Sequence, residues 1–307
     1  MAAPRRSPTA SASGCTRRSR STPDRRTSPR AAVSPRGGPG AASDTTRRLL
    51  LAVPNVSEGR DAEAIAAIAR AFGPGLIHHS SDPDHHRSVF TLRGEPGELV
   101  DRVLAGAREA IARVDLTDHA GAHPRVGAVD VAPIVYLHRD QRGAAIAEAL
   151  VLADRLGHEL EVPVYLYGDL AGGRTRAELR RGGVEGIPPD AGPSRLHPTA
   201  GATLVSARPP LAAFNVEIDA PLEKAREIAA EVRTMPGVRA LGLELPTQGI
   251  VQVSTNVEEL DVTTPADVVR AVQRHATVTG AELVAPAPRS AFESFPDVPL
   301  RGAPLLD

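Results

Sequence analysis

The order of apolar segments along the chain is the feature that most limits its fold. After an N-terminal tail, short continuous apolar runs typical of buried strands alternate with stretches whose apolar residues recur at helical spacing. The first such pair is Leu49–Val53, followed by residues 61–73, in which Ile65, Ile68 and Phe72 share one helical face. Because an amphipathic helix must bury its apolar face against another element, this alternation predicts layered α/β units.

The second half of the chain shows the order strand, helix, strand, strand, helix, strand. Thr264, Pro265 and Asp267 give the second of these helices a start that resembles a capping box. This order is the split βαβ, or ferredoxin-like, arrangement. The strands are expected at Phe214–Ile218, Arg239–Leu245, Ile250–Ser254 and near Glu282–Val284.

The first half approximates the same order, with an added helix over residues 143–160 and an added strand in Val162–Tyr167. We therefore expect an α/β (α+β) fold of two ferredoxin-like sandwiches side by side, with a ligand cleft between them. Residues 171–202 are dense in Gly, Pro and Arg without sustained periodicity, which predicts a long loop with at most one helical turn, suited to binding. The expected divisions are a tail over 1–48, an N-terminal subdomain over 49–170, the loop over 171–202 and a C-terminal subdomain over 203–307.

The tail differs sharply in composition from the rest of the chain. Residues 1–48 contain 11 Arg but only the two acids Asp24 and Asp44, and are otherwise rich in Ser, Pro, Thr and Ala. Such a segment buries too little apolar surface to offset its ordering entropy, so we expect disorder. It is either an arm for nucleic acid or an anionic surface, or a dispensable extension or a start site assigned too far upstream. Because the remainder is acidic, nucleic acid is not expected as the main partner.

Cysteine usage and hydropathy indicate a soluble, cytoplasmic protein. The single cysteine, Cys15, allows neither a disulfide framework nor a thiolate metal site. No run reaches the ~18 apolar residues that a membrane-spanning helix requires. No apolar segment typical of a secretory signal precedes the folded region.

Histidine is concentrated in one part of the chain. Clustered imidazoles suggest either metal binding or proton transfer. His119 and His123 are four residues apart, but Gly121 and Pro124 disfavour a helix there and no glutamate accompanies them, so we expect no metal site. The cluster contains six of the ten histidines: His78, His79, His85, His86, His119 and His123.

His123 differs from the other histidines in its position. It precedes the strand predicted at Val129–Leu137, in a loop from which its side chain can project into a cleft. A histidine on an ordinary surface loop is the alternative interpretation.

Seven segments, in order over about residues 49–286, resemble successive signatures of the glutamate formiminotransferase family. A single short motif can arise by chance, but seven in the same order are specific. They are Val53-Pro54-Asn55-Val56-Ser57-Glu58-Gly59, Asp84–Val89, His123–Val131, Val162–Gly168, Gly192–Gly201, Phe214–Val216 and Gln252–Asn256.

The resemblance implies a function and a fold. The fold is a transferase unit of two α/β subdomains with folate in a groove between them. The activity is transfer of the formimidoyl group from N-formimidoyl-L-glutamate to tetrahydrofolate, in histidine degradation and one-carbon metabolism, with tetrahydrofolate as the acceptor co-substrate. A homodimer is also implied. No cyclodeaminase unit, which follows the transferase in bifunctional animal enzymes, is expected before Asp307.

Matching motifs transfer two sets of site residues. The family's general base is the histidine of its His-Pro-Arg segment, which corresponds to His123. An imidazole with a pKa near ~6.5 suits the deprotonation of the attacking nitrogen. The family's folate-binding segment corresponds to Gly192, Pro193, Ser194, Arg195, Leu196, His197, Pro198, Thr199, Ala200 and Gly201.

Other polar residues lie in or beside these motifs. Arg87, Arg125 and Arg208 are candidates for binding substrate carboxylates, because a guanidinium group binds a carboxylate in bidentate fashion. A surface arginine paired with a neighbouring acid is the alternative for each. The remaining candidates, for contacts to a pterin, are Asp130, which could equally be a buried structural carboxylate, and Gln252 and Asn256, which could cap loops.

The chain departs from the family at two positions. His86 stands where asparagine is more frequent, which could change polar contacts to the substrate, and Val56 stands where an aromatic residue is frequent. Two other functions stay open: a metal-dependent hydrolase of formimidoylglutamate, and a folate-binding protein without catalytic activity. The sequence also does not distinguish a formimidoyl from a formyl donor.

Overall fold

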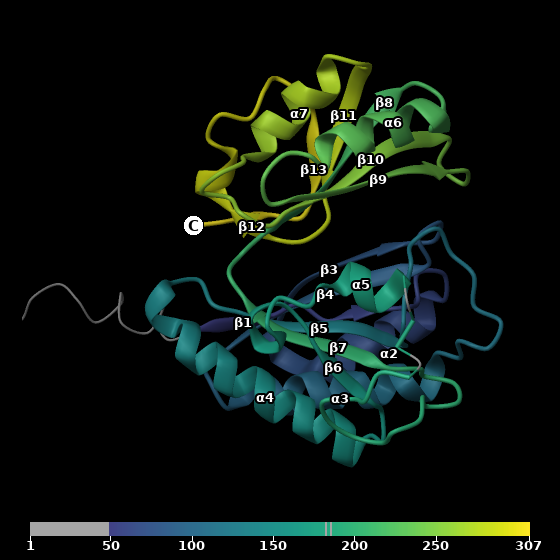
Figure 1. Cartoon of the computed structure of the whole chain (residues 1–307), viewed down its shortest axis with the longest axis vertical. Helices are drawn as coiled ribbons and strands as arrows, with labels where there is room; N and C mark the ends of the chain where they lie inside the picture. Colours follow the sequence, from purple (N-terminus) through teal and green to yellow (C-terminus); the bar gives the residue numbers. More distant parts are fainter. Residues whose placement is uncertain (1–48, 182, 185) are drawn as a thin grey trace, which may run out of the picture. The chain divides into compact units, whose positions relative to one another are not determined.

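The computed structural model describes residues 49–181, 183–184 and 186–307, so the prediction of disorder over 1–48 lies outside the described residues. The described chain forms a seven-stranded, a five-stranded and a two-stranded sheet (Figure 1). No helix in this part of the chain is long and apolar enough to cross a membrane.

The first sheet and its helices contain the predicted βαββαβ order with four additions. β1 and β2 are two parts of one strand interrupted at Val53-Pro54, and both pair with β4 and β5, so the core order is β3-β4-β1/β2-β5. The additions are α4, β6, α5 and β7, with β7 parallel to both β5 and β6. The elements are β1 (Leu50–Ala52), β2 (Asn55–Val56), α2 (Ala62–Phe72), β3 (Leu76–Asp82), β4 (Arg87–Gly94), α3 (Glu98–Arg113), β5 (Val129–Val135), α4 (Arg142–Glu159), β6 (Val164–Leu166), α5 (Arg176–Arg181) and β7 (Thr203–Arg208), with short 3₁₀ turns at Gly73–Gly75, Arg139–Gln141 and Gly168–Ala171.

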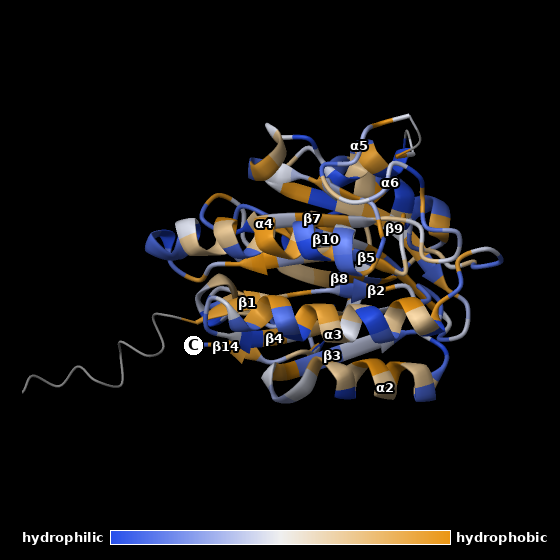
Figure 2. Ribbon diagram, turned by 90° about the horizontal axis from the view of Figure 1, so that it is seen from below, coloured by the Kyte–Doolittle hydropathy of each residue, from blue (hydrophilic) through white to orange (hydrophobic). Residues whose placement is uncertain are grey.

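Local sequence explains where α2 begins and ends. The Asp61 carboxylate accepts hydrogen bonds from the backbone N–H groups of Glu63 and Ala64, at 2.9 and 3.0 Å, which satisfies two donors of the first turn. Gly73 ends the helix with φ +73°, a conformation that other residues adopt at a cost. Figure 2 shows hydrophobic and hydrophilic residues alternating along α2 and α3, as amphipathic helices require.

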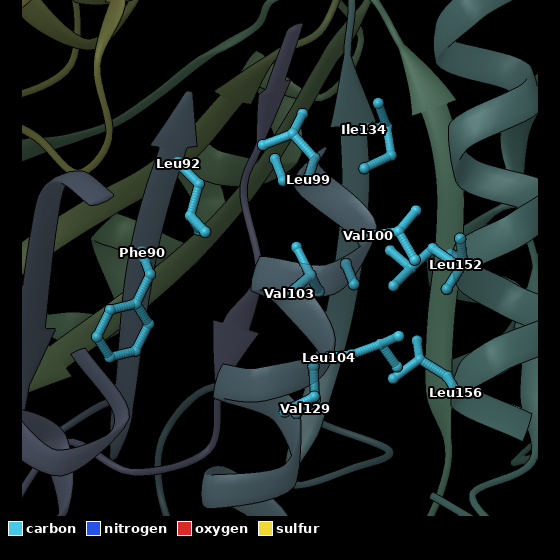
Figure 3. Close-up of a cluster of buried hydrophobic side chains, with 14 of the residues drawn as sticks. Phe90, Leu92, Leu99, Val100, Val103, Leu104, Val129, Ile134, Leu152 and Leu156 are labelled. Atoms are coloured by element: carbon cyan, nitrogen blue, oxygen red, sulfur yellow. The ribbon is translucent and has the colours of Figure 1, made fainter. Parts of the chain in front are cut away.

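One core lies between the first sheet and its helices. Figure 1 shows α3 and α4 on the same side of this sheet. In Figure 3, Val100 and Leu104 of α3 lie beside Leu152 and Leu156 of α4, and all four side chains are buried. Full burial of such a side chain contributes about 1.5–3 kcal/mol. This packing covers one face of the sheet and leaves the other face for a site.

The second sheet has the predicted ferredoxin-like topology. Its order is β13-β11-β8-β10-β9, and the four strands of the βαββαβ unit pair antiparallel. The Thr264 hydroxyl and the Asp267 carboxylate form the predicted capping box at the start of α7. The elements are β8 (Ala212–Asp219), α6 (Leu222–Val232), β9 (Val238–Leu245), β10 (Ile250–Val257), α7 (Pro265–Gln273), β11 (Thr277–Leu283) and β13 (Leu300–Gly302); β12 (Ala287–Pro288), a 3₁₀ turn at Arg289–Phe292 and β14 (Leu305–Leu306) complete the chain.

β7 lies in the first sheet, although the expected division at residue 203 assigns it to the second half. Its residues Thr203–Ala207 are all buried, as is typical of a parallel strand covered on both faces. The sequence of such a strand has no alternation of apolar and polar residues, so it does not indicate which sheet the strand joins. We propose that the first subdomain ends after Arg208 rather than before Thr203.

Candidate active site

A cavity of about 1400 Å³ lies against the face of the first sheet that α3 and α4 do not cover, and its lining comes from both sheets. Because strand side chains alternate between faces, Arg87 and Val89 of β4 line the cavity while Phe90 and Leu92 enter the core. In the second sheet, Ser254 and Asn256 of β10 line it in the same way.

Several hydrogen bonds join the two sheets beside this cavity. The Ser80 hydroxyl donates to the carbonyl of Val284 at 2.7 Å, and the Thr247 hydroxyl donates to the Asp84 carboxylate at 2.6 Å. A further contact is made by the Gln252 amide, whose nitrogen lies 3.1 Å from Nε2 of His85. The β3–β4 turn is therefore attached directly to the second sheet.

His123 lines the cavity from the loop between α3 and β5. Its Nδ1 lies 2.7 Å from the carbonyl oxygen of Pro124. Because a carbonyl can only accept, Nδ1 carries the proton and Nε2 holds the lone pair of the neutral ring. The ring is thus held in the tautomer that a proton acceptor needs.

The surroundings of His123 keep it neutral. Burial lowers its pKa well below the ordinary value, and the Arg87 and Arg180 guanidinium groups lower it further, while Asp130 and the bond to Pro124 act in the opposite direction. At neutral pH the imidazole is therefore available as a base, although its basicity is reduced.

Arg125 holds the His123 loop in place. Its Nη2 donates to the carbonyls of His123 at 2.7 Å and His85 at 3.3 Å, and its Nη1 contacts the His119 ring. The Ala122 N–H donates to the Asp84 carbonyl at 3.0 Å. These bonds bring the backbones of the two histidine-containing segments together.

A buried carboxylate lies behind His123. Asp130 is fully buried, and its Oδ2 accepts from Nη1 of Arg87 at 2.6 Å and from Nη2 of Arg180. Its Oδ1 accepts from the Val126 N–H at 2.8 Å. Burial opposes its ionisation, but Arg180 and Arg87 hold its pKa below the usual range, so Asp130 is a carboxylate shared by two guanidinium groups.

Arg87 is fixed by two partners. Besides Asp130, the Asn55 side-chain oxygen accepts from its Nε at 3.1 Å and from its Nη2 at 2.9 Å. Burial lowers the pKa of Arg87 to about 10, which still leaves it protonated. Its hydrogen-bonding capacity is largely used within the protein.

Two more arginines line the cavity near Tyr167. Arg176 of α5 donates to the Glu258 carboxylate at 2.8 Å, and its guanidinium lies 5.6 Å from the centre of the Tyr167 ring. Arg208, at the end of β7, donates from Nη1 to the Pro209 carbonyl at 2.9 Å. Burial lowers the pKa of Arg208 to about 10.

His85 is the second imidazole of the cavity. Its ring centre lies 6.2 Å from that of His123, and its backbone N–H donates to the Asp82 carboxylate at 2.7 Å. Burial lowers its pKa, while Asp82 acts in the opposite direction. With the Gln252 contact, this arrangement fixes its ring.

The other histidines of the cluster lie elsewhere. The rings of His86 and His119 stack at 3.9 Å in a separate hollow of about 320 Å³. In the described ranges, no group of three or more His, Cys, Asp or Glu side chains is arranged to hold a metal ion.

A family model described as "Formiminotransferase domain, N-terminal subdomain" matches residues 49–208, about half of the chain and ending at the last residue of β7. The chain belongs to the formiminotransferase family. The match, together with the order of the seven signatures, confirms the resemblance found in the sequence.

Named relatives agree with this membership. The glutamate formimidoyltransferase of Streptococcus pyogenes serotype M1 is 36% identical over 231 residues, covering 68% of this chain and 77% of the relative. The corresponding protein of Thermoplasma acidophilum is 34% identical over 232 residues, covering 68% and 76%. The formimidoyltransferase-cyclodeaminase of Sus scrofa is 36% identical over 276 residues, covering 80% and 51%. The chain thus spans about half the length of the bifunctional relatives it matches.

The structure brings several of the predicted site residues together. His123, Arg87, Arg208 and Asn256 line the cavity. Asp130 is buried behind Arg87, and Gln252 is buried against His85. Arg125 does not line the cavity and instead holds the His123 loop.

None of residues 192–201, the segment matched to folate binding, lines the cavity. The segment forms a turn closed by two backbone bonds of 3.0 Å between His197 and Gly201. His197 Nδ1 accepts from the backbone N–H groups of Thr199 and Ala200, so this ring stabilises the turn. Ser194, Arg195 and Leu196 are exposed. Their role in binding folate stays a prediction.

The sequence analysis missed His85, Asn55, Tyr167 and the two α5 arginines as site residues. Asn55, His85 and Tyr167 lie within family signatures, so a signal existed for them. Arg176 and Arg180 lie in the arginine-dense stretch, for which the sequence predicts a long loop with at most one helical turn. A helix of six residues carries too little periodicity to show which arginines it turns inward.

Proposed function

We propose that this protein transfers the formimidoyl group from N-formimidoyl-L-glutamate to tetrahydrofolate, with Nε2 of His123 as the general base. The proposal depends most on the position of the His123 ring, which lines an arginine-rich cavity. Its Nδ1 is hydrogen-bonded to the carbonyl oxygen of Pro124. Relatives that carry the name glutamate formimidoyltransferase support the choice of reaction.

The proposed reaction needs a base and then an acid. A nitrogen of the reduced pterin attacks the amidine carbon and becomes positively charged. His123 takes the proton from that nitrogen, which gives a tetrahedral intermediate and an imidazolium. The imidazolium then donates this proton to the glutamate nitrogen as the carbon–nitrogen bond breaks. One imidazole thus serves both steps and ends neutral, as it began.

The cavity is also large enough for the two substrates. Its volume of about 1400 Å³ is above the range of roughly 300–1,000 Å³ that is usual for one small ligand, as a site for two substrates requires. Holding both in one cavity replaces an encounter in solution with a reaction between oriented groups. We propose that tetrahydrofolate also reaches the exposed residues 194–196 of the segment matched to folate binding.

The proposal is tested by measuring formimidoyl-tetrahydrofolate formed from formimidoylglutamate and tetrahydrofolate, with and without a chelator. The wild type should form this product equally in both conditions. His123→Gln should lower kcat/KM by roughly 10²–10⁴-fold, because glutamine cannot accept the proton. His158→Gln, an exposed substitution on α4, is the matched control and should retain activity.

Other outcomes select the alternatives. Release of formamide or ammonia without a folate product, abolished by the chelator, would indicate a metal-dependent hydrolase. Folate binding without turnover would indicate a non-catalytic binding protein. The homodimer and the cytoplasmic location stay predictions.

A further inference from the structure

One wall of the cavity has more positively charged side chains than carboxylates that pair with them. We call it the arginine wall. Four arginines of the cavity lining, Arg87, Arg176, Arg180 and Arg208, lie close enough to affect one another, because Arg87 interacts with Arg180 and Arg176, and Arg176 with Arg208. Their side chains are largely withdrawn from solvent: those of Arg87, Arg180 and Arg176 are 9%, 12% and 19% exposed.

Two carboxylates pair with these four groups in the described part of the chain. Asp130 is shared by Arg87 and Arg180, and Glu258 pairs with Arg176 and also with the exposed Arg239. No acidic side chain among the described residues forms an ion pair with Arg208. Two other acids of the cavity lining, Asp82 and Glu282, act on His85 instead. Four arginines, largely withdrawn from solvent, therefore have two carboxylate partners.

Unused donors point to the same wall. Within the described residues, the Nε of Arg180 and the Nε of Arg208 are buried and have no hydrogen-bond partner. A buried donor without a partner costs about 1–3 kcal/mol, and more where the group is charged. A ligand that supplies acceptor oxygens would remove this cost.

Two unbalanced guanidinium groups match a ligand with two carboxylates. Planar carboxylates accept the parallel N–H groups of arginine, and such pairs are strongest away from water. An isolated cation such as a metal or an amine would be repelled by the same wall. The ligand must therefore be an anion of charge near −2.

We propose that Arg176, Arg180 and Arg208 form a subsite that binds both carboxylates of a glutamate-type amino acid. The inference rests on the proposed function, because it assigns the residues that hold the donor in the same cavity. It places the donor at the arginine wall, near the Nε2 lone pair of His123, whose pKa responds to Arg180. Arg87, whose donors already bind Asp130 and Asn55, supports this wall and does not contribute a carboxylate contact of its own.

The test is equilibrium binding of L-glutamate, measured by calorimetry without any folate, so that turnover is not needed. The wild type should bind L-glutamate at least about 10-fold more tightly than L-glutamine or γ-aminobutyrate, each of which lacks one carboxylate. Arg208→Gln should weaken L-glutamate binding by about 10–100-fold, the range expected for one lost charge-assisted contact. It should also abolish the preference for L-glutamate over one of the two single-carboxylate ligands.

Controls separate this role from a structural one. Arg226→Gln changes an exposed arginine of α6 outside the cavity and should leave L-glutamate binding unchanged. Because Arg208 is partly buried and forms no ion pair among the described residues, Arg208→Gln should unfold at the same or a higher temperature than the wild type in the absence of ligand. Saturating L-glutamate should raise the unfolding temperature of the wild type more than that of Arg208→Gln. Arg176→Gln gives a second, independent measurement if Arg208→Gln does not fold.

Three results would overturn the inference: unchanged L-glutamate affinity in both variants, equal affinity of the wild type for glutamate and its single-carboxylate analogues, or tighter binding of inorganic phosphate than of L-glutamate. The two proposals fail in different ways. Arginine-dependent glutamate binding without formimidoyl transfer would reject the function and keep the subsite. Normal transfer with an unchanged KM for formimidoylglutamate in Arg208→Gln would reject the subsite and keep the function.

Discussion

Replacing His86 with asparagine should stabilise the protein, and the gain should increase as the pH falls. His86 has φ +49°, in the left-handed region that asparagine occupies more readily than other residues with side chains. This geometry gives a physical reason for the asparagine that is frequent at this position in the family. His86 lies in the smaller hollow and does not line the cavity, so the substitution leaves the proposed site residues in place.

The titration of His86 sets the size of the acidic effect. Burial, and then the neighbouring His119, lower its pKa to about 4, while Glu58 acts in the opposite direction and Arg60 and Arg125 add to the decrease. Because the folded pKa lies below the unfolded value of ~6.5, the unfolded state binds more protons between these values. Stability is therefore lost as the pH falls from about 6.5 to about 4. Between pH 7.5 and pH 5 the loss from this one group is about 2 kcal/mol.

At neutral pH the two effects of the substitution nearly cancel. Asparagine relieves a left-handed backbone cost of about 1 kcal/mol, but it loses the 3.9 Å stacking on His119 and the bond of 3.2 Å from the Gly59 N–H to Nδ1, together worth about 1 kcal/mol. The gain should therefore be near zero at pH 7.5 and about 2 kcal/mol at pH 5.

Urea unfolding of the wild type and His86→Asn at both pH values measures this difference directly. His158→Asn, on the exposed face of α4, controls for the loss of one imidazole. If the difference between wild type and His86→Asn is the same at pH 7.5 and pH 5, the burial of an uncharged His86 in the folded protein is refuted.

Three further substitutions test the site. Arg180→Gln removes a cation that disfavours protonation of His123 and leaves Asp130 less neutralised; it should raise the pKa of His123 and move the acidic limb of the kcat/KM profile to higher pH. Asp130→Asn leaves Arg87 and Arg180 without their buried carboxylate and should lower the free energy of unfolding by about 3–5 kcal/mol, measured in urea. Gly127→Ala should destabilise by about 1–3 kcal/mol in the same assay, because its Cβ would overlap the carbonyl oxygen of Ala202; unchanged stability would contradict the close approach of the backbone at these two residues.

The second sheet could be predicted from the sequence because its signals are local. Val251, Val253 and Val257 of β10 point to one side and Ser254 and Asn256 to the other, which is the alternation of a sheet covered on one face. The start of α7 likewise follows from Thr264 and Asp267, three residues apart. β7 could not be assigned to its sheet in this way. Its pairing with β5 and β6 depends on the tertiary structure, and no local pattern in its sequence indicates it.

The site could be predicted only in part, for a related reason. His123 was found through its motif, but nothing in the chain near Arg87 indicates that Asp130, 43 residues later, lies 2.6 Å from its guanidinium. That contact forms because the side chains of Arg87 on β4 and Asp130 on β5 lie on the same face of the sheet. The two strands are separated by β1 and β2. Arg125 shows the opposite case, since its motif suggested a ligand contact and its position shows a structural one.

The arginine wall and His123 are coupled, and this coupling predicts a difference between two pH profiles. In the free enzyme, burial and then Arg87 and Arg180 keep the pKa of His123 low, which keeps the base neutral but weak. When two carboxylates neutralise the wall, the same electrostatic effect must reverse in part, so the pKa of His123 rises and the imidazole becomes a stronger base only when the donor is bound.

The acidic limb of the kcat profile, which reports the substrate complex, should therefore lie at higher pH than that of kcat/KM, which reports the free enzyme. In Arg208→Gln, where less charge is neutralised on binding, the two limbs should move closer together. Coincident limbs in the wild type would show that the carboxylates bind away from the wall that controls His123.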